Sequence, residues 1–301
     1  MQAIKPKRAN SVSWLDSIPA YLFIAPAFLL FAIFFLRPLV QLGYLSLVEW
    51  EGLGPKIFVG LENYQELLGD SRFWLAFQHN MGWMFAAIFV PTAMGLFLAL
   101  LLVRSSIHGR LIFRTIYFLP QVLSSVVVSV IWRWIYNPNY GAINSILRAM
   151  GLDYLARGWL GDKLTALPAL FIAWSWIHYG FCMVIFIAAL QAIDETYYDA
   201  AKVDGANPLQ QLWYITLPFI RRPLATVILI TIISAFQVFD LVFIITRGGP
   251  ARATLVLSVF MYDSAFRYEK VGYGAAVGLT LGVVIFVVSL IYMRLRVRLE
   301  A

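Results

Sequence analysis

Apolar residues in this chain are gathered into long blocks with few charges, and shorter polar segments separate the blocks. A helix that crosses ~30 Å of hydrocarbon needs about 20 apolar residues, because each residue adds about 1.5 Å of length. Six blocks are long enough, so the pattern predicts six membrane-spanning helices. We place these spans at about residues 17–44, 80–103, 112–135, 166–190, 223–246 and 271–293.

The composition agrees with this pattern. Of the 301 residues, 61% are hydrophobic and 13% are charged. Soluble domains are about 45–50% apolar and about 25% charged, so this chain has too little polar surface for a water-soluble fold. The predicted fold class is therefore all-α, a polytopic membrane protein with a cytoplasmic tail at residues 1–16 and one transmembrane domain at residues 17–301.

The first block follows a basic tail that contains Lys5, Lys7 and Arg8, which is also how a secretory signal begins. A signal peptide has an apolar core of only about 7–15 residues, followed by a cleavage site of small residues. Here twenty uncharged residues lead into Arg37-Pro38 without such a site. We therefore interpret the first block as an anchor that stays in the membrane.

Basic residues indicate the orientation, because cytoplasmic loops are enriched in Lys and Arg. Segment 104–114 contains three arginines, and the last eight residues contain three more. The loop 45–79 has only Lys56 and Arg72. Both termini and the loop 191–222 are therefore predicted to lie in the cytoplasm. The net charge of +7 is then a sign of topology, and no nucleic-acid partner is expected.

Few residues in the sequence are suited to catalysis or metal binding. The single Cys182 lies in the fourth span, and His79, His108 and His178 are far apart without the spacing of a zinc site. The chain contains neither the GxxxxGK[ST] phosphate loop nor the GxSxG nucleophile motif. We predict that the chain is not an enzyme, that it has no catalytic or metal-binding residues, and that it does not hydrolyse ATP by itself.

The loop 191–222 is longer than a simple connection requires and is predicted to form two short helices. Thr196 and Asp199 have the spacing of a capping box, with Asp in place of Glu. Gly205 suits a helix C-terminus, where a positive φ is often needed. Asn207-Pro208 is typical of the start of a second helix, which Leu217-Pro218 is predicted to end.

The pattern Asp199-Ala-Ala-x-x-Asp204-Gly205-Ala206, followed by Thr216-Leu217-Pro218, resembles the "EAA" loop of ATP-binding-cassette importer permeases. The family usually has Glu where this chain has Asp199. The resemblance implies that the loop is a coupling helix that sits in a groove of an ATPase subunit. The candidate coupling residues are Asp199, Ala200, Ala201, Asp204 and Gly205.

Four further motifs, spread over roughly residues 20–293, are similar to the carbohydrate-uptake branch of this family. They are Gly60-Leu61-Glu62-Asn63-Tyr64, Arg114-Thr115-x-x-Phe118-Leu119-Pro120, Tyr136-Asn137-Pro138-x-Tyr140-Gly141-x-x-Asn144 and Thr246-Arg247-Gly248-Gly249-Pro250. The resemblance implies one permease subunit of a type I importer for a sugar or sugar-like solute in the cytoplasmic (inner) membrane of a prokaryote.

The same resemblance implies a set of partners. These are a second homologous permease subunit, two ATPase subunits that hold ATP and Mg, an extracytoplasmic solute-binding protein, and membrane lipid. No cofactor is expected in this chain. An alternative function is a secondary transporter or channel without an ATPase, which would need membrane-buried charges for ion coupling. A membrane scaffold that transports nothing is a further alternative.

Spans four and five carry candidate solute-binding residues. Three side chains on span four lie on one helical face, at i, i+4 and i+7. Three polar residues on span five fall at an overlapping depth, and related permeases line the solute site with these stretches. The mixture of an apolar plate and hydrogen-bonding groups suits a sugar, although these residues could equally serve packing. The candidates are Trp174, His178, Phe181, Thr231, Ser234 and Gln237.

Two other features of the spans have more than one interpretation. Asp240 is the only charge in the fifth block and is a functional candidate, because a charge is costly at membrane depth. It could instead reach the outer interface or pair with a basic residue. Gly274, Gly278 and Gly282 allow another helix to approach closely, either within this subunit or from the sister permease.

Overall fold

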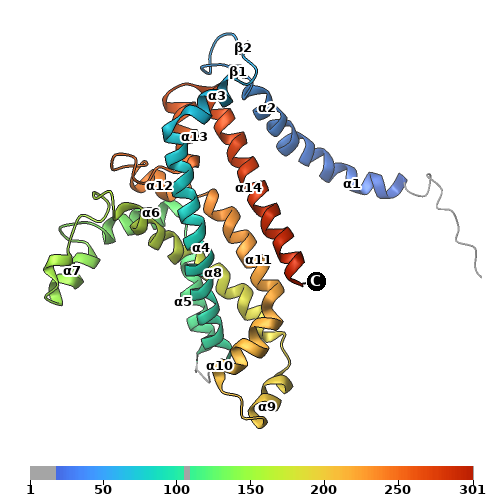
Figure 1. The fold of residues 1–301 in the computed structure, drawn as a ribbon, viewed down its shortest axis with the longest axis vertical. Coiled ribbons are helices and arrows are strands. Elements are labelled where there is room, and N and C mark those ends of the chain that lie inside the picture. The colour runs from blue at the N-terminus through green and yellow to red at the C-terminus, as the bar shows by residue number, and fades with distance from the viewer. Residues whose placement is uncertain (1–17, 105–108, 301) are drawn as a thin grey trace, which may run out of the picture.

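The computed structural model describes residues 18–104 and 109–300, and it is almost entirely helical (Figure 1). The predicted tail 1–16 and His108 lie outside these residues. Four long helices form the central bundle: α4 (Ser71–Arg104), α8 (Ala166–Gln191), α11 (Leu217–Phe236) and α14 (Val271–Glu300). An additional arm consists of α1 (Ile18–Phe31), the π-helical turn η2 (Ala32–Leu36) and α2 (Arg37–Leu45).

The connections gather at two ends of the bundle. At the end predicted to face outside lie the hairpin β1 (Val48–Glu49) and β2 (Ile57–Phe58), α3 (Glu62–Gly69), α13 (Leu257–Tyr262) and the π turn η5 (Asp263–Arg267). The hairpin is antiparallel and pairs Val48 with Phe58. At the opposite end lie α9 (Glu195–Val203), α10 (Pro208–Gln211) and the π turn η4 (Leu212–Thr216) (Figure 1).

Within the described residues, five helical segments are long and apolar enough to cross a membrane: 21–45, 71–103, 166–191, 208–245 and 271–296. A sixth span results if α5 (Arg110–Val122) and α6 (Ser125–Ile135) are counted together. These positions agree with the six predicted spans. The third span, 112–135, was predicted as one continuous helix. That prediction was wrong, because α5 and α6 are bent by 98° relative to each other.

Ser124 explains the bend between α5 and α6. Its backbone is extended (φ −60°, ψ 138°), and its hydroxyl accepts a hydrogen bond from the backbone N–H of Val126. This bond caps a new helix at residue 125 in place of continuing the old one. Beyond it, α6, α7 (Ala142–Ala149) and the short 3₁₀ turn η3 (Asp153–Leu155) project sideways from the bundle (Figure 1).

The fifth span differs from its predicted bounds, 223–246, at both ends. Leu217-Pro218 does not end a helix, because α10, η4 and α11 form one helical segment from Pro208 to Phe236. A proline disturbs a regular α-helix through its missing N–H and its crowded ring, but the wider π turn directly before Pro218 accommodates it. The span then breaks at residues 237–239 and resumes as α12 (Asp240–Ile245).

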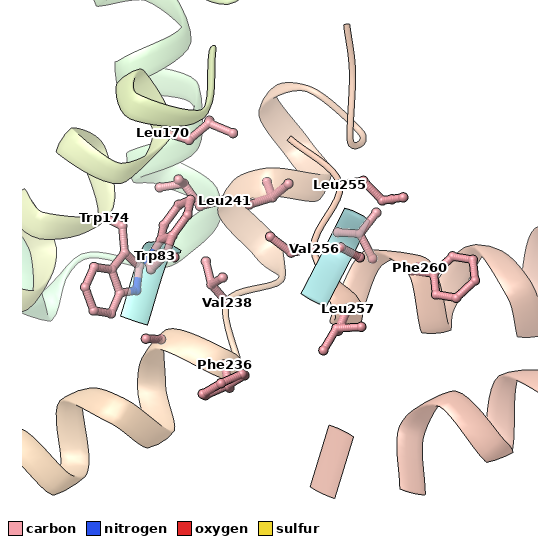
Figure 2. Packing of buried hydrophobic residues seen from close by; sticks show 14 of the residues in the cluster. Trp83, Leu170, Trp174, Phe236, Val238, Leu241, Leu255, Val256, Leu257 and Phe260 are labelled. Atoms are coloured by element: carbon pink, nitrogen blue, oxygen red, sulfur yellow. The ribbon is translucent and has the colours of Figure 1, made fainter. Parts of the chain in front are cut away.

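The bundle is held together by close contact between α4 and α8. A Cβ atom at Gly95 would lie 2.5 Å from the Cβ of Cys182 and 2.8 Å from the backbone N of Met183, so the two helices meet where α4 has no side chain. Toward the outer end the core continues over α11, α12 and the segment 255–257. Figure 2 shows its members Trp83, Leu170, Trp174, Phe236, Val238, Leu241, Leu255, Val256, Leu257 and Phe260.

The glycines of α14 pack within this subunit. A Cβ atom at Gly274 would lie 2.6 Å from the Cβ of Ala265, and one at Gly278 would lie 2.8 Å from the Sδ of Met261. Both neighbours belong to the α13–η5 segment. Gly282 has no heavy atom of the described chain within 4 Å of that position. The structure therefore favours the first of the two interpretations for Gly274 and Gly278.

The arm α1–η2–α2 leaves the bundle at its outer end and extends away from it (Figure 1). Most of its membrane-crossing segment, 21–45, is exposed, and only α2 at its end contacts the bundle, at α14. Large apolar side chains such as Phe23 and Phe34 are exposed along it. The arm therefore presents an apolar surface that lipid or another protein must cover.

Candidate functional site

The loop 191–222 has a defined geometry at the end of the bundle. Asp194 caps α9, because its Oδ1 accepts hydrogen bonds from the backbone N–H of Thr196 (2.9 Å) and from its hydroxyl (2.8 Å). These bonds, the backbone one first, lower the pKa of Asp194. The predicted capping box of Thr196 and Asp199 was wrong, because the capping residue lies two positions earlier and both residues lie inside α9.

Asp199 faces outward from α9 and forms an ion pair with Lys202, at 2.8 Å between Nζ and Oδ1. Both side chains are largely exposed, so the pair adds little to stability. The candidates Ala200 and Asp204 are also exposed, and Ala201 is half-buried. The candidate carboxylate is therefore available to a partner surface.

Gly205 ends α9 in the predicted way. Its φ is +78°, a conformation in which any residue with a side chain is strained. The N–H of Ala206 donates to the carbonyl of Ala201 at 2.8 Å, which closes the helix end. Asn207 and Gln210 then form a reciprocal capping box that begins α10, as Asn207-Pro208 predicted. The two short helices are thus joined by one sharp, well-defined turn.

Apolar side chains are exposed around this turn. Val203 is 88% exposed, Leu209 63% and Tyr214 80%. We call these three residues, with Asp199 and Gly205, the coupling surface. Large apolar patches on a protein surface often mark interaction sites, so these residues are candidates for contact with another protein.

A cavity of 860 Å³ lies between the coupling loop and the ends of the spans. Its lining includes Arg110 and Arg114 of α5, Leu190 of α8, and Tyr198 of α9. The Tyr198 hydroxyl lies 3.2 Å from the hydroxyl of Thr216, which ties α9 to the beginning of the fifth span. A force on α9 would therefore reach α11 through this contact as well as through the chain.

The structure packs three of the six solute candidates together in the interface between α8 and α11, and a fourth, Phe181, contacts His178 beside them. His178 Nε2 lies 2.8 Å from Thr231 Oγ1, which joins α8 to α11. The rings of Trp174 and His178 are stacked with centroids 4.5 Å apart. All three side chains are buried within the subunit. The predicted overlap in depth between the two helices is therefore confirmed for His178 and Thr231.

The other three candidates lie more openly. Phe181 contacts His178 with ring centroids 5.6 Å apart and is half-buried. Ser234 is half-buried, and Gln237 is exposed at the point where α11 ends. Among the described residues, no hydrogen bond links Ser234 or Gln237 to His178. Their role in solute binding stays a prediction.

Asp240 lies at the start of α12 and is exposed. The hydroxyl of Ser125 donates a 2.5 Å hydrogen bond to its Oδ2. Asp240 therefore pairs with a hydroxyl of α6, and within the described chain it has no basic partner within 4.0 Å. Sequence reasoning missed Ser125, although two adjacent serines inside an apolar block were a possible signal of a helix break.

Two of the sequence motifs hold outer segments in place. The Asn63 side chain donates to the backbone carbonyls of Ser46 and Val48, each at 3.0 Å, and so clamps the hairpin to α3. The buried Asn144 donates to the carbonyl of Arg157 at 2.9 Å and accepts from the indole N–H of Trp159 at 2.8 Å. These motifs are therefore structural clamps.

The fold is that of the transmembrane subunit of an ATP-binding-cassette importer. It matches, with a TM-score of 0.84 and 24% identity, a chain in the crystal structure of a bacterial ABC transporter involved in the import of the acidic polysaccharide alginate. The match covers 96% of this chain and 99% of that chain. The alternative of a secondary transporter or channel finds no support here.

The chain belongs to the family of binding-protein-dependent transport system inner membrane components, whose signature matches residues 92–301. It is 36% identical to the probable ABC transporter permease protein YurN of Bacillus subtilis (strain 168), over 93% of this chain and 96% of that protein. It is 32% identical to the arabinooligosaccharides transport system permease protein AraP of the same organism, over 96% and 94% of the two chains.

Proposed function

We propose that this permease moves a sugar or an oligosaccharide inward and is driven by ATPase subunits that dock on the coupling surface. The observation that carries the proposal is the surface itself, where exposed apolar side chains surround the turn at Gly205. ATP and Mg would be bound and used in the ATPase subunits, while this chain supplies the path and the docking helix. Closure of the ATPases would push on α9 and move α11.

The apolar arm supports a second permease subunit as a partner. Most of this apolar segment is exposed in its own chain, and helices in a membrane associate with a neighbour through close packing. A pair of permeases would bind two ATPases, one for each coupling surface. An extracytoplasmic binding protein would deliver the solute to the outer end, as the family description implies.

A sugar is the solute class that suits the site. Trp174 offers an aromatic plate for the CH face of a ring, and His178, Ser234 and Gln237 offer hydrogen-bonding groups for hydroxyls. The similarity to the arabinooligosaccharide permease AraP supports the same class. Since Trp174 and His178 are buried in this conformation, solute contact requires the α8–α11 interface to open during the cycle.

Purification of a tagged chain expressed with its genomic neighbours tests the proposed function. We expect an ATPase to co-purify and the solute-loaded binding protein to stimulate hydrolysis of Mg-ATP in proteoliposomes. Asp199→Lys should weaken ATPase association by reversing a charge on the coupling surface, whereas the matched change Asp199→Glu should be mild. Solute uptake that continues without any ATPase would contradict the proposal.

A further inference from the structure

Four arginines line a small cavity at the outer end of the molecule. The cavity has a volume of 200 Å³ and is lined by Arg72 of α4, Arg267 of η5, and two residues of the loop between α12 and α13, Arg247 and Arg252. All but Arg72 are exposed, so the cavity opens toward solvent. The arginines come from three separate parts of the chain that the fold brings together.

The cavity lies at the outer end of the second span on the predicted topology. Arg72 precedes Asn80, where the predicted second span begins, by eight residues of the same helix. At the rise of an α-helix this separation is roughly 12 Å. On that topology Arg72 lies beyond the hydrocarbon, near the outer limit of a headgroup layer about 5–8 Å thick.

The loop that presents two of the arginines is fixed from inside. The buried hydroxyl of Thr254 donates to the carbonyl of Gly249 at 2.7 Å and lies 2.7 Å from the hydroxyl of Thr246. At the end of the loop, Asn80 accepts a hydrogen bond from the N–H of Leu257 at 2.8 Å. Arg247 and Arg252 therefore sit on a preorganised frame.

The backbone at these two arginines is unusual. Their φ angles are +50° and +69°, a region that residues with side chains rarely adopt. Such conformations cost free energy and are concentrated at ligand clamps and other functional positions. Ala251 of the same loop also has a positive φ, +46°, so the strain belongs to the conformation of the whole loop that carries both arginines.

The positive charge of the cavity is only partly balanced. Arg72 is held by Asp70 at 2.7 Å, and Arg267 faces Asp263 at 4.0 Å. Burial raises the pKa of Asp263 above its ordinary value, which the nearby Arg267 and Arg247 oppose. In the described part of the chain, no carboxylate lies within 4.0 Å of Arg247 or Arg252. These two groups are therefore available to an external anion.

We propose that this cavity receives an acidic side chain, Asp or Glu, from the external binding protein when that protein docks on the permease. Arginine pairs with a carboxylate through two parallel hydrogen bonds, so Arg247 and Arg252 can fix both position and orientation. The proposal rests on the proposed function, because it requires a binding protein as the partner.

Size favours this occupant over the transported solute. Cavities that hold small-molecule ligands measure about 300–1,000 Å³, and at 200 Å³ this one is too small for an oligosaccharide but large enough for a carboxylate side chain. A phospholipid headgroup is the alternative anion, and the test below separates it by lipid composition. Charge complementarity of this kind mainly speeds docking and selects the right partner.

The test measures how much binding protein is needed for half-maximal stimulation of ATP hydrolysis by the complete transporter in nanodiscs. For the double variant Arg247→Glu/Arg252→Glu we expect this concentration to rise at least tenfold, with unchanged hydrolysis in the absence of binding protein. The value for the wild type should rise with ionic strength, and that for the variant should not. The charge-conserving variant Arg247→Lys/Arg252→Lys should behave much more like the wild type.

The control is Lys163→Glu, which reverses one charge at an exposed residue of another outer loop, where we expect no change. Equal concentrations for the double variant and the wild type would overturn the proposal. A tenfold effect that appears in nanodiscs of anionic lipid and vanishes in neutral lipid would also overturn it, in favour of a lipid site. If the wild type itself shows no stimulation by binding protein, the proposed function has failed instead.

Discussion

The hydroxyl of Ser125 donates a 2.5 Å hydrogen bond to the carboxylate of Asp240, across 115 positions of the sequence. Both residues stand directly after breaks in apolar segments. Ser125 begins α6 after the 98° bend, and Asp240 begins α12 after the end of α11. The bond therefore joins two broken spans at the points where their direction changes, and α6 packs along α12 beyond it.

Asp240→Ala should loosen this junction. Removal of the acceptor leaves the Ser125 hydroxyl without its partner and should lower stability by about 1 kcal/mol, since the site is exposed to competing water. Asp240→Asn keeps an oxygen acceptor and should be milder. Thermal unfolding of the purified complex measures the difference. Equal stability of Asp240→Ala and the wild type would show that the bond to Ser125 contributes nothing.

Gly95→Ala should destabilise the bundle. The added methyl group would lie 2.5 Å from the Cβ of Cys182, so α4 and α8 must separate, at a cost of about 1–3 kcal/mol. Gly82→Ala is the matched control on the same helix, because no heavy atom lies within 4 Å of its Cβ position. Alanine favours a helix over glycine, so that variant should be neutral or slightly more stable. Melting temperatures of the two variants decide the point.

Gly205→Val should abolish uptake while the protein still reaches the membrane. A branched residue at φ +78° is strained by about 1–2 kcal/mol or changes the backbone, and either outcome misplaces the coupling surface. Gly54→Val imposes similar strain at φ +80° in the outer hairpin, where no heavy atom lies within 4 Å of the new Cβ. Uptake by the Gly54 variant should persist. Loss of uptake in both would point to a general folding defect.

Trp174→Ala and His178→Ala should cut solute uptake at least tenfold and leave assembly and basal ATP hydrolysis largely intact. This result is expected if both rings contact the solute when the α8–α11 interface opens. Ile187→Ala, at another buried position of α8, serves as a control for loss of packing alone. If the Trp174 and His178 variants lose uptake only as far as they lose thermal stability, the pair is a structural contact.

The spans could be predicted from the sequence because their apolar blocks are long and nearly free of charge. The bend at Ser124 was not predicted, since Val122 and Val126 continue the same apolar block across it. The adjacent serines were the local sign of the break, which one side-chain hydrogen bond decides. Pro218 led to the opposite error, because a helix end was predicted where the helix continues. Proline usually ends a helix, but the π turn before it lets the segment continue from Pro208 to Phe236.

The candidate sites could be predicted from the sequence to different degrees. The overlap in depth of spans four and five could be predicted because antiparallel helices convert residue numbers into depth, but the contact between His178 and Thr231 was not predicted. The turn at Gly205 could be predicted because only local backbone geometry is involved. The outer arginine cavity could not be predicted, because Arg72 and Arg267 are 195 positions apart in the sequence and meet only through the tertiary fold.

The exposed arm has a consequence for biosynthesis. A newly made copy inserts an apolar arm of which only the last segment, α2, contacts its own bundle, at α14, so the unassembled subunit displays an apolar surface that a partner would cover. Membrane proteases and insertases sample such surfaces, and an excess of this subunit over its partner should therefore be removed. The arm would in that way keep the amounts of the transporter's subunits matched without any dedicated regulator.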